Sequence, residues 1–167
     1  MIQIEGLGKY FGEMKVLRNI SMKVEQGDIF GVVGHSGAGK STMLRCLNGL
    51  ETYSEGSVKV MGHEVAALSP EKLKELRRDM GMIFQNFNLM NRKNVYENVM
   101  FPLEVWGVPK KEAAARVEEL LELVGLSEKR SEKVRNLSGG QKQRIGIARA
   151  LALKPKLLLC DEATSAL

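Results

Sequence analysis

The chain has 167 residues, 44% of them hydrophobic, and a formal net charge of +5. This length and composition suit one soluble globular domain with at most a small subdomain. The sequence contains no apolar run near the ~18 residues that span a bilayer, and it does not begin with a secretory-signal pattern. Lys and Arg are scattered, so the charge does not call for a nucleic-acid surface. Cys46 and Cys160 are too few for a disulfide framework, and we expect both to be small core residues.

The first 50 residues predict strands followed by a helix. Apolar segments within residues 2–24 are separated by turn signals, which is typical of a meander of strands. Residues 29–33, "IFGVV", have the character of a buried strand. Residues 34–39 break this pattern with glycine, and residues 40–50 resume it at helical spacing. We therefore expect a strand, a glycine loop and a helix in this order.

The rest of the chain alternates between strands and helices. Residues 58–61 and 80–85 are strand-like, and a short charged helix opens at 69–72 between them. Residues 94–152 are mostly helical, and 156–160 return to an apolar strand. This alternation predicts a parallel α/β core with the helical stretch inserted between two of its strands.

One amphipathic helix is well defined by its periodicity. Gly125 follows its last apolar position as a C-terminal cap, and Glu112 and Arg116 are spaced to pair on its solvent side. Its apolar stripe consists of Ala113, Val117, Leu120, Leu121 and Val124.

The stretch "GHSGAGKST" carries the clearest chemistry. Gly34, Gly39, Lys40 and Ser41 match the spacing G-x-x-x-x-G-K-[ST] between a predicted strand and a helix. Backbone amides of such a loop wrap phosphates, while Lys40 neutralises their charge and the Ser41 hydroxyl ligates Mg²⁺. A flexible glycine turn with an incidental lysine is the plainer alternative. The candidate nucleotide-binding residues of the loop are Gly34, His35, Ser36, Gly37, Ala38, Gly39, Lys40, Ser41 and Thr42.

Three further positions complete a nucleotide site. In "LLLCDE", a buried strand delivers Asp161 towards Mg²⁺ and Glu162 towards the attacking water, unless the two acids form a solvated turn. Gln85 ends the strand "GMIFQ", where a neutral amide can touch metal or water; its alternative is an ordinary exposed polar residue. Phe11 offers an aromatic face for adenine, although core packing is the default for a single Phe.

A second anion-ready segment lies at "LSGGQ". Ser138 is a suitable N-cap for the helix that follows, but capping does not explain Gly139 and Gly140, which weaken helix propensity by up to ~1 kcal/mol each. Without Cβ atoms, they let a phosphate of another molecule approach the helix start.

These motifs, in this order, resemble the ATP-binding-cassette (ABC) ATPases over the whole chain, and "LSGGQ" is that family's own signature. The resemblance implies one ABC ATPase domain: a P-loop NTPase (RecA-like) α/β core with an N-terminal antiparallel β subdomain and an inserted α-helical subdomain. Residues 1–85 and 155–167 correspond to the nucleotide-binding core, and residues 86–154 to the helical signature subdomain. "ATSAL" at 163–167 begins the family's next loop, so we expect a cassette that is incomplete at its C-terminus, which leaves its own ATP hydrolysis open.

The resemblance also implies roles for the candidate residues. Two cassettes pack head to tail as a homodimer, and the signature of one covers the ATP in the phosphate loop of the other. By this resemblance Phe11 stacks on adenine, Gln85 joins metal and water to the membrane partner, and Glu162 is the catalytic base. Within the signature, Ser138, Gly140 and Gln141 reach the γ-phosphate in trans, and Gly139 is a further nucleotide-binding residue.

Within the family, "GMIFQNFNLMNRKNVYENVMFPLE" and "LLLCDEATSAL" look most like the ATP-binding subunits of bacterial methionine importers. Such a subunit hydrolyses ATP with Mg²⁺ at the cytoplasmic face of the membrane, contacts transmembrane permease subunits, serves an extracytoplasmic substrate-binding protein indirectly, and binds no nucleic acid. Importers of polar amino acids or phosphonates have similar cassettes. A cassette ATPase of DNA repair is disfavoured because residues 85–137 lack heptads, and one acting on ribosomes is disfavoured by the importer-like residues.

Overall fold

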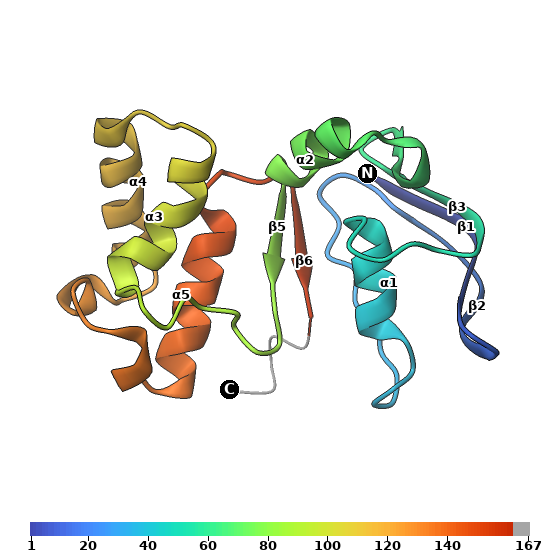
Figure 1. Cartoon of the computed structure of the whole chain (residues 1–167), viewed down its shortest axis with the longest axis horizontal. Coiled ribbons are helices and arrows are strands. Elements are labelled where there is room, and N and C mark those ends of the chain that lie inside the picture. The colour runs from blue at the N-terminus through green and yellow to red at the C-terminus, as the bar shows by residue number, and fades with distance from the viewer. Residues whose placement is uncertain (162–167) are drawn as a thin grey trace. The chain divides into compact units, whose positions relative to one another are not determined.

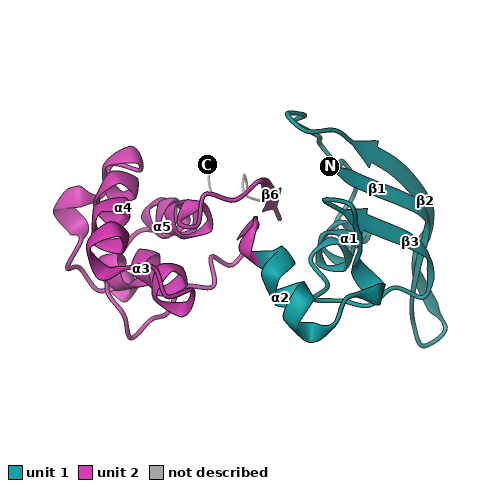
Figure 2. Ribbon diagram, turned by 90° about the horizontal axis from the view of Figure 1, so that it is seen from above, with its two compact units in different colours: residues 1–77 teal, residues 78–167 magenta. Residues whose placement is uncertain are grey.

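A computed structural model describes residues 1–161 of the chain. Its contacts divide the chain into two compact units, residues 1–77 and residues 78–167 (Figure 2). Each unit has buried side chains of its own. Among the described residues, none of the helices combines the length and apolar character needed to cross a bilayer.

Unit 1 is built on an antiparallel sheet (Figure 1). The strands are β1 (Ile2–Phe11), β2 (Met14–Val24), β3 (Glu55–Val60) and β4 (His63–Glu64), in the order β2-β1-β3-β4. Helix α1 (Lys40–Leu47) contacts β2 and β3, with Met43, Cys46 and Leu47 buried. The unit is completed by a 3-10 turn (Val65–Ala67) and by helix α2 (Pro70–Arg78), whose last residue is counted with unit 2.

Unit 2 combines three helices with a parallel pair of strands. Helices α3 (Val95–Val105), α4 (Lys110–Leu123) and α5 (Gly139–Leu151) pack on one another around an apolar core that includes Val99, Val117 and Ile145. Two 3-10 turns, Ser127–Lys129 and Val134–Asn136, lie between α4 and α5. Strands β5 (Met80–Ile83) and β6 (Leu157–Cys160) pair in parallel, which confirms the predicted parallel element.

The amphipathic helix predicted from periodicity is confirmed as α4. Four residues of its stripe are buried, and Val124 packs partly buried against the same core. Gly125 follows with φ +65° and donates its N–H to the Glu122 carbonyl, as expected for a C-terminal glycine. The stripe buries the helix as its spacing predicts.

The buried strand expected at residues 29–33 is absent. Ile29 and Val33 have exposed fractions of 103% and 98%, and none of the strands in the described part of the chain pairs with this segment. A strand needs a neighbour for its N–H and C=O groups. The apolar residues at 29–33 favour burial, but they do not determine whether a neighbouring strand is present to pair with them.

Two smaller expectations are also wrong. Cys46 is buried, and burial raises the pKa of its thiol to about 11, but Cys160 is exposed. Strand alternation explains the difference, because Cys160 shares a face of β6 with the exposed Leu158, while Leu159 faces the interior.

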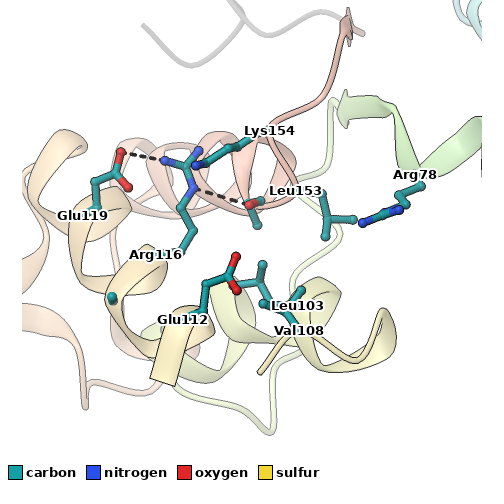
Figure 3. Close-up of a pocket in the computed structure, with 10 residues that line it drawn as sticks. Arg78, Leu103, Val108, Glu112, Arg116, Glu119, Leu153 and Lys154 are labelled. Carbon is teal, nitrogen blue, oxygen red and sulfur yellow. Dashed lines mark hydrogen bonds and ion pairs between the residues drawn. The ribbon is translucent and has the colours of Figure 1, made fainter. Parts of the chain in front are cut away.

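Arg116 does not form the expected surface pair with Glu112. Its side chain is only 16% exposed, and Nη1 lies 2.6 Å from Glu119 Oε1 (Figure 3). The guanidinium also donates to the Leu151 carbonyl at 2.9 Å. It lines a cavity of about 430 Å³ inside unit 2, together with Glu112. The long side chain reaches the C-terminal carbonyls of α5, and these acceptors hold it away from solvent.

Candidate functional site

The phosphate loop of the sequence is an exposed turn at the start of α1. Residues 34–38 are exposed, and the first helical hydrogen bond runs from the Met43 N–H to the Gly39 carbonyl at 2.9 Å. Gly39 has φ +91°, and a Cβ there would lie 2.7 Å from Leu17 Cδ2. Backbone conformation and close packing against β2 therefore both require glycine at this position.

The Lys40 side chain folds back over this loop. Its Nζ donates to the Gly34 carbonyl at 2.7 Å and to the His35 carbonyl at 2.9 Å. The ammonium thus lies across the loop at a helix start, where the helix dipole also favours negative charge. Ser41 and Thr42 follow, partly exposed, in the first turn of α1. This arrangement suits an anion of several charges.

Phe11 ends β1 in the same unit and is not a core residue. Its side chain is 44% exposed. Lys9 Nζ lies 4.7 Å from the ring centroid, and Lys9 is itself held by Glu51 Oε1 at 2.7 Å. Lys9 therefore contacts the Phe11 ring while part of the ring stays exposed, and an exposed aromatic ring suits stacking on a planar base.

The segment "LSGGQ" forms the start of α5. Ser138 Oγ accepts a hydrogen bond from the Gln141 N–H at 3.3 Å, and Gln141 Oε1 accepts one from the Ser138 N–H at 2.9 Å. This reciprocal pair is a capping box. A Cβ at Gly139 or Gly140 would meet no described atom within 4 Å. Packing within the described chain therefore does not require these glycines, in agreement with an approach from outside.

Gln85 and Asp161 follow the two parallel strands of unit 2. Ile83 pairs with Cys160 at the ends of β5 and β6, and the Asp161 N–H donates to the Ile83 carbonyl at 2.9 Å. Both residues therefore come after the same edge of the strand pair, where parallel sheets bind ligands. Asp161 is only 5% exposed, whereas Gln85 is exposed. Glu162 lies outside the described residues.

The candidate residues are thus divided between the two units. Unit 1 carries Phe11 and the loop at residues 34–42, whereas unit 2 carries Gln85, Asp161 and the signature at residues 138–141. Residues 34–39 precede α1 but lack the expected strand at residues 29–33, Gln85 and Asp161 follow β5 and β6, and the signature lies at the start of α5.

Sequence reasoning overlooked two residues that hold the segment after Gln85. Asn98 is fully buried on α3 and binds Met90, and Arg149 on α5 binds the carbonyls of Phe87 and Asn88. A polar residue within the apolar face of a predicted helix, as Asn98 is beside Val99, is a signal that could have found the first.

Comparison with known proteins places the chain in a family. The family described as ABC transporter matches residues 17–165. Over all 167 residues the chain is 64% identical to the methionine import ATP-binding protein MetN of Clostridium acetobutylicum. It is 59% identical to the protein of the same name from Clostridioides difficile. The chain spans about half, 52%, of the length of each of these relatives.

Solved structures agree with this sequence comparison. The dimeric ATP-binding cassette MJ0796 in a post-hydrolysis state bound to ADP and Pi matches the whole chain with a TM-score of 0.91 at 35% identity, and 76% of that protein is covered. A second dimeric structure of the same bacterial ABC transporter cassette matches with a TM-score of 0.92. The predicted α/β cassette fold is therefore confirmed, and the chain belongs to the ABC transporter family.

Proposed function

We propose that this chain is the ATP-binding part of a subunit that hydrolyses ATP to drive methionine import through a membrane permease. The observation that carries the proposal is a pair of helix starts, at Lys40 and at Ser138, where first-turn backbone N–H groups and the helix dipole favour an anion. Similarity to methionine import ATP-binding proteins along the whole chain supports the solute and the coupling to transport.

ATP binding rests on unit 1 in this proposal. The Lys40 ammonium already lies across the loop, bound to two backbone carbonyls. Phosphate oxygens replace these carbonyls as its acceptors, because they carry full negative charge. The remaining residues of the loop, 34–39 and 41–42, line the phosphates with their backbone amides, and Phe11 stacks on the adenine ring. The Ala38 N–H, which donates to the His35 carbonyl at 3.1 Å, exchanges this acceptor for a phosphate oxygen.

The residues present fit a magnesium ion bound with the nucleotide. Ser41, Gln85 and Asp161 offer hydroxyl, amide and carboxylate oxygens, which are the donors that Mg²⁺ prefers. Asp161 is buried directly after β6. When bound, the ion neutralises phosphate charge. Glu162 is the proposed general base for the attacking water, with Gln85 positioning that water.

The second helix start binds the γ-phosphate of a partner molecule. Ser138 Oγ accepts from the Gln141 amide, so its own O–H proton remains to donate to a phosphate oxygen. Gly139 and Gly140 have no Cβ atoms, so the N-terminus of α5 is open to that phosphate. A head-to-tail homodimer with two shared ATP sites follows, and the dimeric state of the solved cassettes supports it.

We further propose a functional division into a nucleotide-binding core, residues 1–85 and 155–167, and a helical signature subdomain, residues 86–154. The direct pairing of β5 with β6 supports it, because these strands come from the two core segments and flank the helices in sequence. The subunit acts at the cytoplasmic face of the membrane as a translocase ATPase, in contact with permease subunits that receive methionine from an extracytoplasmic binding protein.

The test removes the Lys40 ammonium in the full-length protein. We expect Lys40→Ala to weaken ATP binding at least about tenfold, because the phosphates lose their main cation. Lys72→Ala is the matched control, since Lys72 is an exposed lysine in the first turn of α2. Titration calorimetry measures both affinities, and methionine uptake into vesicles with the permease measures function. Equal ATP affinity in the two variants contradicts the loop's role, and uptake of a phosphonate or polar amino acid instead of methionine contradicts the solute.

A further inference from the structure

The segment after β5 is held by a charged side chain of α5. Arg149, in the last turn of that helix, donates from Nη2 to the Phe87 carbonyl at 2.8 Å and from Nη1 to the Asn88 carbonyl at 2.7 Å. Burial lowers the pKa of the guanidinium from its ordinary value, but arginine remains charged in proteins. Both bonds are therefore charge-assisted; the bond to Phe87 is partly buried, and the bond to Asn88 is exposed.

These two carbonyls belong to an unusual piece of backbone. Phe87 and Asn88 have φ angles of +58° and +48°, and both are non-glycine residues in the left-handed region. Each such residue costs on the order of 1 kcal/mol, so a pair in succession persists only when its surroundings hold it. The turn has local bonds from the Phe87 N–H to the Phe84 carbonyl at 3.1 Å and from the Asn88 N–H to the Asn86 carbonyl at 2.6 Å. The fork of Arg149 adds to them by binding both carbonyls of the pair at once.

A second side chain holds the far end of the same segment. Asn98 of α3 is fully buried; its Oδ1 accepts from the Met90 N–H at 2.8 Å, and its Nδ2 donates to the carbonyls of Met90 at 3.3 Å and Asn94 at 2.8 Å. The amide is thus fully used. Residues 86–90 are therefore fastened to α5 at one end and to α3 at the other, directly after Gln85.

The attachment to α5 has a consequence because of what else this helix carries. Its first turn is the signature, Ser138–Gln141, and its last turn carries Arg149, roughly 16 Å away along a continuous helix. A helix of this length moves as a rod, so a displacement of its start is passed to the carbonyls that Arg149 binds. Those carbonyls lie two and three residues from Gln85.

We propose that Arg149 is a positioning residue that couples the signature helix to Gln85, so that capture of a partner's ATP at Ser138 adjusts the placement of Gln85 for hydrolysis. This rests on the proposed function of both sites. Asn98 holds the other end of the segment, at Met90, on α3.

The test replaces Arg149 by methionine in the full-length protein, which keeps an unbranched chain and removes both hydrogen bonds. Arg144→Met is the matched control: it lies on the same helix and donates to the Val124 carbonyl at 3.1 Å, outside the segment. We expect Arg149→Met to lower kcat for ATP hydrolysis about tenfold while ATP affinity stays within about twofold, and Arg144→Met to keep kcat within about twofold. Arg149→Lys retains the charge but not the two-pronged guanidinium, so its kcat should lie between those of Arg149→Met and the wild type.

Amide hydrogen exchange provides the second readout and separates coupling from folding. In the wild type, ATP should change exchange in residues 86–90; in Arg149→Met these amides should exchange faster and no longer respond to ATP, while the midpoint of thermal unfolding shows that the variant is folded. The proposal is overturned if the wild type is active and Arg149→Met is equally active. It is also overturned if amide exchange at residues 86–90 is the same in Arg149→Met as in the wild type, or does not respond to ATP in an active wild type. A wild type that hydrolyses no ATP contradicts the proposed function instead.

Discussion

Gly39 shows how one backbone position fixes the candidate phosphate site. Its φ of +91° lies in the left-handed region, and a Cβ would approach Leu17 Cδ2 to 2.7 Å and the Val16 carbonyl to 3.1 Å. We expect Gly39→Ala to lower the free energy of unfolding by about 1–3 kcal/mol, because strain and overpacking act together. Urea unfolding of the full-length protein measures the change.

Gly37 provides the matched control for that substitution. It also has a positive φ, +78°, but a Cβ there would meet no described atom within 4 Å. Gly37→Ala should therefore cost only the backbone strain, about 1 kcal/mol. Equal destabilisation by the two substitutions would show that packing of the loop against β2 contributes nothing.

At the scale of the element, two helices of unit 2 begin in the same way. Asn94 caps α3 and Ser138 caps α5, and each forms a capping box with the residue three positions later. A cap of this kind contributes about 1 kcal/mol to stability. Only the Ser138 cap is proposed to bind a phosphate. Comparing the two caps therefore separates the contribution of capping to stability from its contribution to ATP hydrolysis.

We therefore expect Asn94→Ala and Ser138→Ala each to lower the free energy of unfolding by about 1 kcal/mol. Only Ser138→Ala should also lower the rate of ATP hydrolysis at saturating ATP, by about tenfold, because its hydroxyl is the one placed at the partner's phosphate. Chemical unfolding and a steady-state phosphate-release assay give the two quantities. A similar loss of hydrolysis in Asn94→Ala would mean that helix stability alone explains the effect.

The helices were predictable from sequence and one strand was not, for a physical reason. The apolar stripe of α4 marks the face that becomes buried, because a helix satisfies its backbone internally. Residues 29–33 carry an equally apolar pattern, but a strand also requires a partner that no local pattern names. The antiparallel strands of unit 1 were predictable since the turn at residues 12–13 brings β1 directly back against β2.

For the candidate site, the sequence predicted local positions. Spacing selected Lys40, Ser138 and Asp161 as candidates because each motif combines a residue type with a place in an element, and their roles stay predictions. It did not reveal that the Lys40 ammonium binds its own loop or that Arg149 binds the segment after Gln85. Such contacts join residues up to 62 positions apart, and only the fold brings them together.

At the scale of the whole molecule, the proposed function requires two chains for every site. Each chain contributes a phosphate loop to one ATP and a signature to the other, so a Lys40→Ala chain and a Ser138→Arg chain complement each other. In an equal mixture, half the dimers are mixed, and each mixed dimer has one intact site out of two. We expect about a quarter of wild-type ATP hydrolysis from the mixture and almost none from either variant alone.

Steady-state hydrolysis after dissociation and reassembly of the full-length proteins measures this complementation. The control mixes Lys40→Ala with the double variant Lys40→Ala/Ser138→Arg, which leaves every phosphate loop defective and should recover nothing. If each site lay within one chain, a mixed dimer would contain two defective sites, and the first mixture would be as inactive as the control. Recovery in the first mixture alone therefore requires the Lys40 loop and the Ser138 helix start of different chains to act on the same nucleotide.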